Sequence, residues 1–159
     1  MKLEELTMTK KICFTSSSGG HLEQLLMLKP LMNKYACFIV TEKTAYEVNV
    51  SCRSYKLLQI NRRELLWFIY LLYNLYLSVK IMVKEKPDVI ISTGVLSTIP
   101  ICLVGKLCRK KIIYIESFAK TTSKTKTGQL MYYIADRFYI QWESLQMLYP
   151  KGIYKGGIY

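Results

Sequence analysis

The chain contains one histidine, and it follows a run of small residues. His21 ends the sequence Ser-Ser-Ser-Gly-Gly-His at residues 16–21, which follows the apolar segment 12–14 and Thr15. An imidazole titrates near physiological pH and can remove the proton from a hydroxyl that attacks as a nucleophile. Glu116, at the end of another apolar run, is the second candidate base. The competing interpretations are structural: His21 orients its own loop, and Glu116 binds nearby backbone N–H groups.

Two turns of small residues are candidate phosphate sites. In the first, adjacent glycines allow close backbone approach, and free N–H groups at the start of a following helix attract anions. The second turn, residues 93–97 (TGVLS), follows the apolar run 88–92. The alternative is a plain turn between a strand and a helix. The candidate ligands of a phosphate or pyrophosphate are Ser17, Ser18, Gly19, Gly20, Thr93, Gly94 and Ser97.

Several common cofactor and metal motifs are absent from the sequence. Gly19 and Gly20 are adjacent and no third glycine follows, so the dinucleotide motif GxGxxG is missing, as is the phosphate loop GxxxxGK[ST]. The five cysteines include no CxxC pair, which disfavours zinc and indicates reduced thiols. We therefore expect neither a metal nor a resident cofactor.

Apolar runs alternate with helical patterns along the chain. We expect helices that begin near residues 21, 98 and 128, a short helix at 44–50, and strands at 12–14, 36–40, 55–60, 88–92, 111–115 and 137–140. This alternation predicts an α/β fold, a Rossmann-like parallel sheet with helices on both faces. Ligands of such sheets bind beyond the carboxyl ends of the strands, where both small-residue turns and Glu116 should gather.

The segment between Arg62 and Pro87 is predicted as one long helix with an unusual first half. Residues 65–77 are all apolar or aromatic except Asn74, and basic residues flank both ends. This run is too short to span a bilayer, but aromatics with basic flanks suit the headgroup region. A crossover helix covered by a partner is the alternative. The expected membrane contacts are Arg63, Trp67, Phe68, Tyr70 and Tyr73.

Length and charge limit the possible classes of protein. The 159 residues fit a single domain, and their net charge of +12 favours anionic lipid, phosphorylated ligands or nucleic acid. Nucleic-acid binding is the weaker alternative, because the aromatics lie largely in one apolar helix and no common recognition motif occurs. Residues 1–10 do not form a signal peptide and are expected to be a frayed end.

Four segments together resemble a known family. They are SSSGGHLEQLLML, KPDVIISTGVLSTIP, YIESFAK and YPKGIYKGG, and they are similar to bacterial capsule and exopolysaccharide relatives of the asparagine-linked-glycosylation anchor subunit. Those proteins resemble the N-terminal half of a GT-B glycosyltransferase. The resemblance extends to the peptidoglycan GlcNAc transferase, whose glycine-rich first loop also ends Gly-Gly-His; here serines replace the earlier glycines.

The resemblance implies one subunit of a two-component enzyme. Residues 1–159 would form a single acceptor-side domain on the cytoplasmic face of the membrane, and a small partner would bind the UDP-sugar. The implied reaction is inverting, metal-independent transfer of a hexose to a polyprenyl-pyrophosphate-linked acceptor. A non-catalytic scaffold that activates a complete partner enzyme is the alternative.

The last residues are predicted to contact that partner. Residues 142–159 are rich in aromatics and glycine, and no clear element follows Pro150. Aromatic side chains commonly anchor interfaces, so we expect a tail that a partner orders, and a chain that is inactive alone. The alternative is a tail that packs on its own domain. The expected interface residues are Trp142, Tyr149, Tyr154 and Tyr159.

Overall fold

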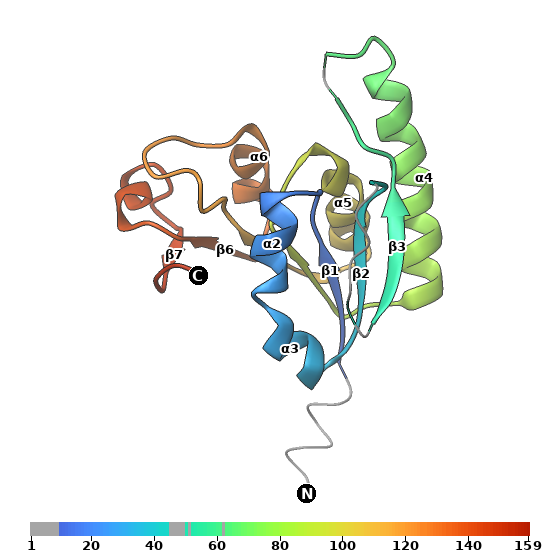
Figure 1. The fold of residues 1–159 in the computed structure, drawn as a ribbon, viewed down its shortest axis with the longest axis horizontal. Helices are drawn as coiled ribbons and strands as arrows, with labels where there is room; N and C mark the ends of the chain where they lie inside the picture. The colour runs from blue at the N-terminus through green and yellow to red at the C-terminus, as the bar shows by residue number, and fades with distance from the viewer. Residues whose placement is uncertain (1–9, 45–49, 51, 62) are drawn as a thin grey trace, which may run out of the picture.

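The computed structural model describes residues 10–44, 50, 52–61 and 63–159. These residues build a parallel sheet of seven strands in the order β3-β2-β1-β4-β5-β6-β7 (Figure 1). The strands are β1 (Lys11–Thr15), β2 (Ala36–Glu42), β3 (Arg53–Leu57), β4 (Val89–Ser92), β5 (Lys111–Ile115), β6 (Arg137–Ile140) and β7 (Ile153–Tyr154). The predicted Rossmann-like α/β fold is confirmed. The expected frayed end and the short helix at 44–50 lie almost entirely outside the described residues.

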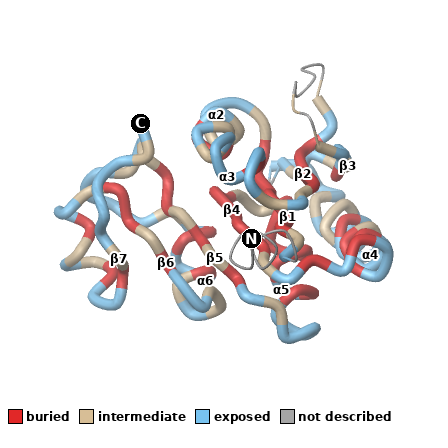
Figure 2. Tube along the Cα trace, turned by 90° about the horizontal axis from the view of Figure 1, so that it is seen from below, coloured by how far each residue is buried: buried red, intermediate tan, exposed pale blue. Residues whose placement is uncertain are grey.

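Helices cover both faces of this sheet. Figures 1 and 2 show α2 and α3 on one face, and α4, α5 and α6 on the other. The helices are α2 (Gly20–Leu26), α3 (Lys29–Lys34), α4 (Trp67–Glu85), α5 (Ile99–Leu107) and α6 (Lys126–Ile134), with short 3₁₀ helices η1 (Leu96–Thr98) and η2 (Glu143–Met147). Each face of the sheet therefore has its own core.

Strand β1 shows how the sequence pattern produces two cores. Side chains alternate across a strand, so Ile12 and Phe14 pack with α2 and α3, while Cys13 packs with α4 and α5. Both faces of a parallel sheet are buried, which explains why its strands read as continuous apolar runs. The central strands β1 and β4 are held in register by parallel pairing from Ile12 with Val89 onward.

Several element boundaries differ from the sequence-based expectation. Strand β3 spans Arg53–Leu57 and not residues 55–60. Strand β2 extends to Glu42, because it keeps its pairing with β3 as far as Leu57. Helix α4 begins at Trp67, after a turn in which the Asn61 side chain accepts a hydrogen bond from the Arg63 N–H at 3.1 Å. The segment after Pro150 is not without structure, since β7 pairs with β6.

A buried carboxylate ties three elements together at the amino ends of the strands. Glu85, near the end of α4, is 4% exposed and binds Lys11 of β1 and both Arg53 and Tyr55 of β3. The Arg53 guanidinium lies 2.7 Å from its Oε1. Burial alone would raise the pKa of Glu85, but the hydrogen bonds from Lys11, Tyr55 and Arg53 outweigh it and lower this pKa to about 2.

This depressed pKa predicts a dependence of stability on pH. The contribution of Glu85 is fully present above its ordinary pKa of 4.5 and is lost as pH falls toward about 2. We expect Glu85→Gln to lower the free energy of unfolding by about 1.5–3 kcal/mol at neutral pH and to flatten its decline in acid. Denaturant unfolding at a series of pH values measures both effects, with exposed Glu23→Gln as the control. Parallel stability curves for wild type and Glu85→Gln would contradict this assignment.

Candidate functional site

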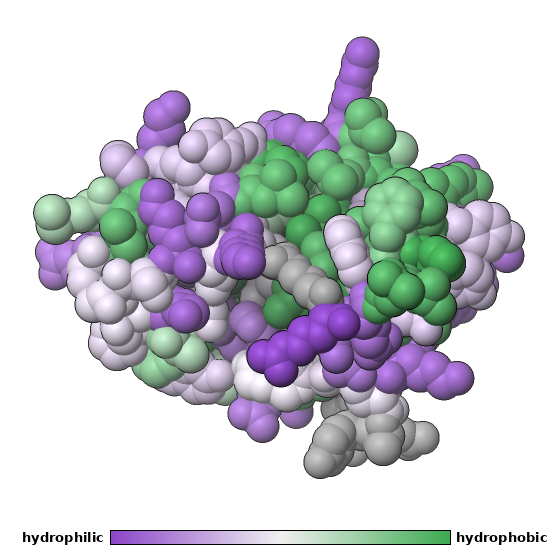
Figure 3. All heavy atoms as spheres, turned by 90° about the horizontal axis from the view of Figure 1, so that it is seen from above, coloured by the Kyte–Doolittle hydropathy of each residue, from purple (hydrophilic) through white to green (hydrophobic). Residues whose placement is uncertain are grey.

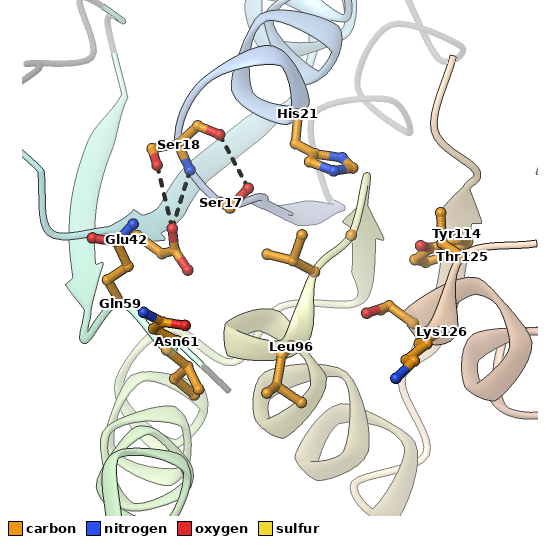
Figure 4. A pocket seen from close by; sticks show the side chains of 14 residues that line it. Ser17, Ser18, His21, Glu42, Gln59, Asn61, Leu96, Tyr114, Thr125 and Lys126 are labelled. Carbon is orange, nitrogen blue, oxygen red and sulfur yellow. Dashed lines mark hydrogen bonds between the residues drawn. The ribbon is translucent and has the colours of Figure 1, made fainter. Parts of the chain in front are cut away.

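A pocket of about 470 Å³ opens at the carboxyl ends of the strands. Its wall combines the turns after β1 and β4 with Glu42 at the end of β2, Tyr114 of β5 and residues 59–61 and 125–127. The close view shows polar side chains from these separate segments facing a shared space (Figure 4). The prediction that the first two small-residue turns meet at this edge is therefore confirmed.

His21 is fixed in this wall by a reciprocal pair of hydrogen bonds with Thr93. The ring Nδ1 lies 2.8 Å from the Thr93 carbonyl oxygen, and the Thr93 hydroxyl donates to the His21 carbonyl oxygen at 2.8 Å. A carbonyl oxygen only accepts, so Nδ1 carries the proton. In the neutral ring Nε2 then has the free lone pair, and no described residue bonds it. This arrangement allows Nε2 to act as a proton acceptor.

Gly94 makes room for that ring. Its φ of +111° belongs to the region that favours glycine. A Cβ at this position would lie 3.1 Å from the Tyr114 hydroxyl and 3.4 Å from Cε1 of His21. Glycine is therefore favoured at this position by its backbone conformation and by the nearby Tyr114 hydroxyl, and it lies beside the His21 ring.

The predicted phosphate ligands do not all face the pocket. Three of them line it, namely Ser17, Ser18 and Gly94. Thr93 and Ser97 are buried and lie outside the lining, while Gly19 and Gly20 lie exposed at the start of α2. Helix α2 has only seven residues. Phosphate binding by this loop stays a prediction, and Ser18 argues against it, because its N–H and hydroxyl already face a carboxylate.

That carboxylate belongs to Glu42, which lies two residues beyond the strand predicted at residues 36–40. Its Oε2 accepts hydrogen bonds from the Ser18 N–H at 3.4 Å and the Ser18 hydroxyl at 3.3 Å. Glu42 is 5% exposed and lines the pocket. The rule that selected Glu116, a carboxylate at the end of a parallel strand, would also have selected Glu42 had β2 been extended by two residues.

Glu116 does not face the pocket, and this contradicts the prediction that it is a base. Its side chain is fully buried. The carboxylate accepts hydrogen bonds from the Ser117 N–H at 2.8 Å, the Thr125 hydroxyl at 2.9 Å and the Tyr149 hydroxyl at 2.7 Å. Burial, followed by the bond to Glu116, raises the pKa of Tyr149, which keeps this hydroxyl protonated and donating. Glu116 is therefore a structural residue that positions its neighbours.

The effect of Glu116 reaches the pocket through helix α6. Thr125 is the N-cap of α6 and accepts a hydrogen bond from the Gly128 N–H at 2.7 Å. Residues 125–127 line the pocket, so fixing Thr125 also fixes Lys126 in the wall. On the other side, the Gln24 and Gln141 side chains donate to the Glu116 carbonyl oxygen at 3.1 and 2.7 Å.

Two of the predicted partner contacts belong instead to the chain's own packing. Tyr149 is fully buried, and Trp142 donates from Nε1 to the Phe118 carbonyl oxygen at 2.7 Å. This corrects the prediction that a partner orders these two side chains. Tyr154 and Tyr159 are 42% and 59% exposed, so partner contact through them stays a prediction.

The first half of α4 exposes an apolar surface beside the pocket. Phe68 and Tyr73 are 54% and 48% exposed, Trp67 and Tyr70 are half-buried, and Arg63 is exposed. Leu65, Leu66, Ile69 and Leu72 add to this surface. Seen from above, hydrophobic residues gather on the α4 side of a hollow, and hydrophilic residues lie on its other side (Figure 3). Among the described residues, no helix has the length and hydropathy needed to cross a bilayer.

Sequence comparison connects this fold and site to a family. Residues 12–158 match the model of the family described as "Oligosaccharide biosynthesis protein Alg14 like". The human protein named UDP-N-acetylglucosamine transferase subunit ALG14 is 33% identical over 93 residues, which cover 55% of this chain and 43% of that protein. The Candida albicans protein of the same name is 38% identical over 92 residues, which cover 54% of this chain and 42% of that protein. The chain thus matches less than half the length of these relatives.

Solved structures show the same architecture. MurG of Acinetobacter baumannii matches with a TM-score of 0.71 and 16% identity over 85% of this chain and 42% of that one. A UDP-N-acetylglucosamine 2-epimerase of Rickettsia bellii matches with a TM-score of 0.72 and 12% identity over 94% of this chain and 45% of that one. At these identities the likeness shows the fold alone. The chain has the fold of the N-terminal half of GT-B glycosyltransferases such as MurG.

The packing around Glu116 gives a prediction about Gly128. A Cβ on Gly128 would lie 1.9 Å from Oε2 of Glu116 and 2.6 Å from the Thr125 hydroxyl. Although alanine usually stabilises a helix, we expect Gly128→Ala to lower the free energy of unfolding by about 1–3 kcal/mol. Gly20→Ala is the control, because its Cβ would have no neighbour within 4 Å. Denaturant unfolding compares the two, and a Gly128→Ala variant as stable as wild type would refute this packing.

Proposed function

The chain belongs to the family of Alg14-like oligosaccharide biosynthesis proteins, and we propose that it is the acceptor-side subunit of a two-component glycosyltransferase. A small partner binds the UDP-sugar, and this chain binds a polyprenyl-pyrophosphate-linked acceptor in capsular or exopolysaccharide biosynthesis. The transfer is inverting, and it needs no resident cofactor because the UDP-sugar is the donor substrate. The observation that carries the proposal is the fixed His21 ring in the pocket at the sheet edge.

His21 performs the proton transfer in this proposal. A sugar hydroxyl is a poor nucleophile until a base takes its proton as the new bond forms. The Nε2 lone pair, left free by the bond from Nδ1 to Thr93, takes that proton. The acceptor oxygen then attacks the anomeric carbon of the donor sugar, and the UDP leaves from the opposite side. The UDP-sugar lies on the partner, so both subunits are needed to assemble the reacting groups.

The exposed surface of α4 gives the acceptor its route to the pocket. Residues 59–61 line the pocket and lead into the segment that begins α4. We place this surface at the cytoplasmic side of the membrane, peripherally, where the lipid chain of the acceptor remains in the bilayer. Lys80 and Lys84, further along α4, add positive charge that favours an anionic headgroup region.

Reconstitution tests this function directly. We expect robust transfer from UDP-N-acetylglucosamine to a lipid-linked acceptor only when the chain is combined with a small donor-binding subunit encoded beside it. Radiolabelled sugar in the extracted lipid product is the readout. Transfer by this chain alone, or transfer by the partner alone at the full rate, would contradict the two-component proposal.

The same assay tests the proposed base. We expect His21→Ala to lower turnover of the assembled enzyme by about two orders of magnitude, the usual size of general-base loss. Co-purification with the partner serves as the control for assembly. A His21→Ala complex that assembles and turns over at the wild-type rate would favour the non-catalytic scaffold.

Membrane attachment is tested on the exposed residues of α4. We expect the triple variant Phe68→Ser, Ile69→Ser, Leu72→Ser to bind anionic vesicles at least about tenfold more weakly, because apolar surface no longer enters the interface. The matched control is Leu107→Ser with Tyr133→Ser, which removes two side chains that are 84% and 85% exposed on other helices. Vesicle sedimentation measures both. A folded triple variant that sediments like wild type would exclude this surface.

A further inference from the structure

Glu42 is a buried carboxylate in the pocket wall that lacks a cation. Its Oε2 accepts two long hydrogen bonds from Ser18, and its Oε1 has no partner among the described residues. Within the described part of the chain, no Lys, Arg or His lies within ion-pair distance of it. Burying a carboxylate to this extent costs desolvation free energy unless hydrogen-bond donors compensate its charge. The other oxygen is not among the buried polar atoms without a partner, so it is open to the pocket, where solvent or a ligand can donate to it.

The polar groups of the pocket are divided between its two sides. Figure 4 shows Glu42, Gln59 and Asn61 together on one side and Lys126 on the other. Among the described residues that line this pocket, Lys126 is the one permanent cation. A carboxylate repels the oxygens of a phosphate and accepts hydrogen bonds from hydroxyls. The side formed by Glu42 suits the hydroxyl groups of a sugar and does not suit a diphosphate.

We propose that Glu42 binds a hydroxyl of the acceptor sugar and thereby sets which end of the acceptor lies near His21. This inference rests on the proposed function, and it adds a specificity-determining residue to that site. The free oxygen of Glu42 accepts the hydroxyl proton in a hydrogen bond, and the neighbouring Gln59 amide, which no described residue bonds, offers a second contact. The diphosphate of the acceptor lies away from Ser18, whose N–H and hydroxyl are taken by Glu42.

A purely structural role for Glu42 makes a different prediction. In that case Glu42 only holds the Ser18 turn against β2, and removing either partner of the contact has the same consequence. In the binding role, Ser18→Ala loses the contact but keeps the carboxylate that the sugar needs. The two variants therefore separate the two roles.

The experiment measures binding of defined probes to the whole chain by calorimetry. The probes are geranyl diphosphates that carry N-acetylglucosamine, glucose or galactose, the single-deoxy analogues of the tightest binder, and geranyl diphosphate without a sugar. The variants are Glu42→Gln, Ser18→Ala and, as a matched control, Glu64→Gln, an exposed residue whose backbone N–H donates to the Asn61 carbonyl oxygen. Thermal unfolding checks that each variant is folded, and the assembled enzyme supplies acceptor KM and kcat.

We expect Glu42→Gln to weaken binding of the sugar-bearing probe by roughly tenfold to a hundredfold, which corresponds to the loss of a hydrogen bond to a charged group. Binding of geranyl diphosphate should not change. One deoxy analogue should bind wild type more weakly than the parent probe does, and Glu42→Gln should not weaken its binding further. In Ser18→Ala this analogue should still bind more weakly than the parent probe. In the assembled enzyme the acceptor KM should rise more than kcat falls.

Three kinds of result would overturn the inference in distinguishable ways. If wild type binds a sugar-bearing probe and Glu42→Gln binds it equally, or no deoxy analogue shows coupling to Glu42, the inference fails while the proposed function stands. If wild type binds none of the sugar-bearing probes, both fail. Equal losses in Ser18→Ala and Glu42→Gln would assign Glu42 to the structural role.

Discussion

The reciprocal hydrogen bonds between His21 and Thr93 are the constraint on which the site depends. They join the turn after β1 to the turn after β4, two neighbouring strands at the centre of the sheet. The strand order reverses there, since β1 continues to β2 on one side and β4 to β5 on the other. Such switch points leave a crevice between diverging turns. The two bonds hold one ring at this crevice and determine which of its nitrogens is free.

Three buried carboxylates illustrate how environment separates structural from functional acids. Glu85 lies at the amino ends of the strands, where Lys11 and Arg53 compensate its charge. Glu116 lies under the pocket, where N–H and hydroxyl donors surround its carboxylate. Glu42 lies in the pocket wall with one oxygen bonded and one free. The first two stabilise the fold, and only the third has unused capacity toward a ligand.

The sequence predicted the architecture better than it predicted the side-chain contacts. Continuous apolar runs are typical of parallel strands, so six strands and their shared edge followed from pattern alone, and His21 followed from its place in a glycine turn. The burial of Glu116 did not follow, because its donors Thr125 and Tyr149 lie 9 and 33 residues away. Glu42 was missed because the end of β2 depends on pairing with β3. Two of the four tail aromatics were misjudged, because Trp142 packs on Phe118 and Tyr149 is buried beside Glu116.

The tautomer of His21 decides whether its pocket nitrogen can accept a proton. The chain has one histidine, so imidazole ¹⁵N labelling gives a spectrum with a single ring and no assignment problem. At a pH where the ring is neutral, the account predicts a protonated Nδ1 and an unprotonated Nε2, with the Nδ1 proton protected by Thr93. Thr93→Ala changes only the hydroxyl bond and should preserve this tautomer if the carbonyl bond determines it. A wild-type ring protonated at Nε2 would contradict the account, because its pocket nitrogen could not accept a proton.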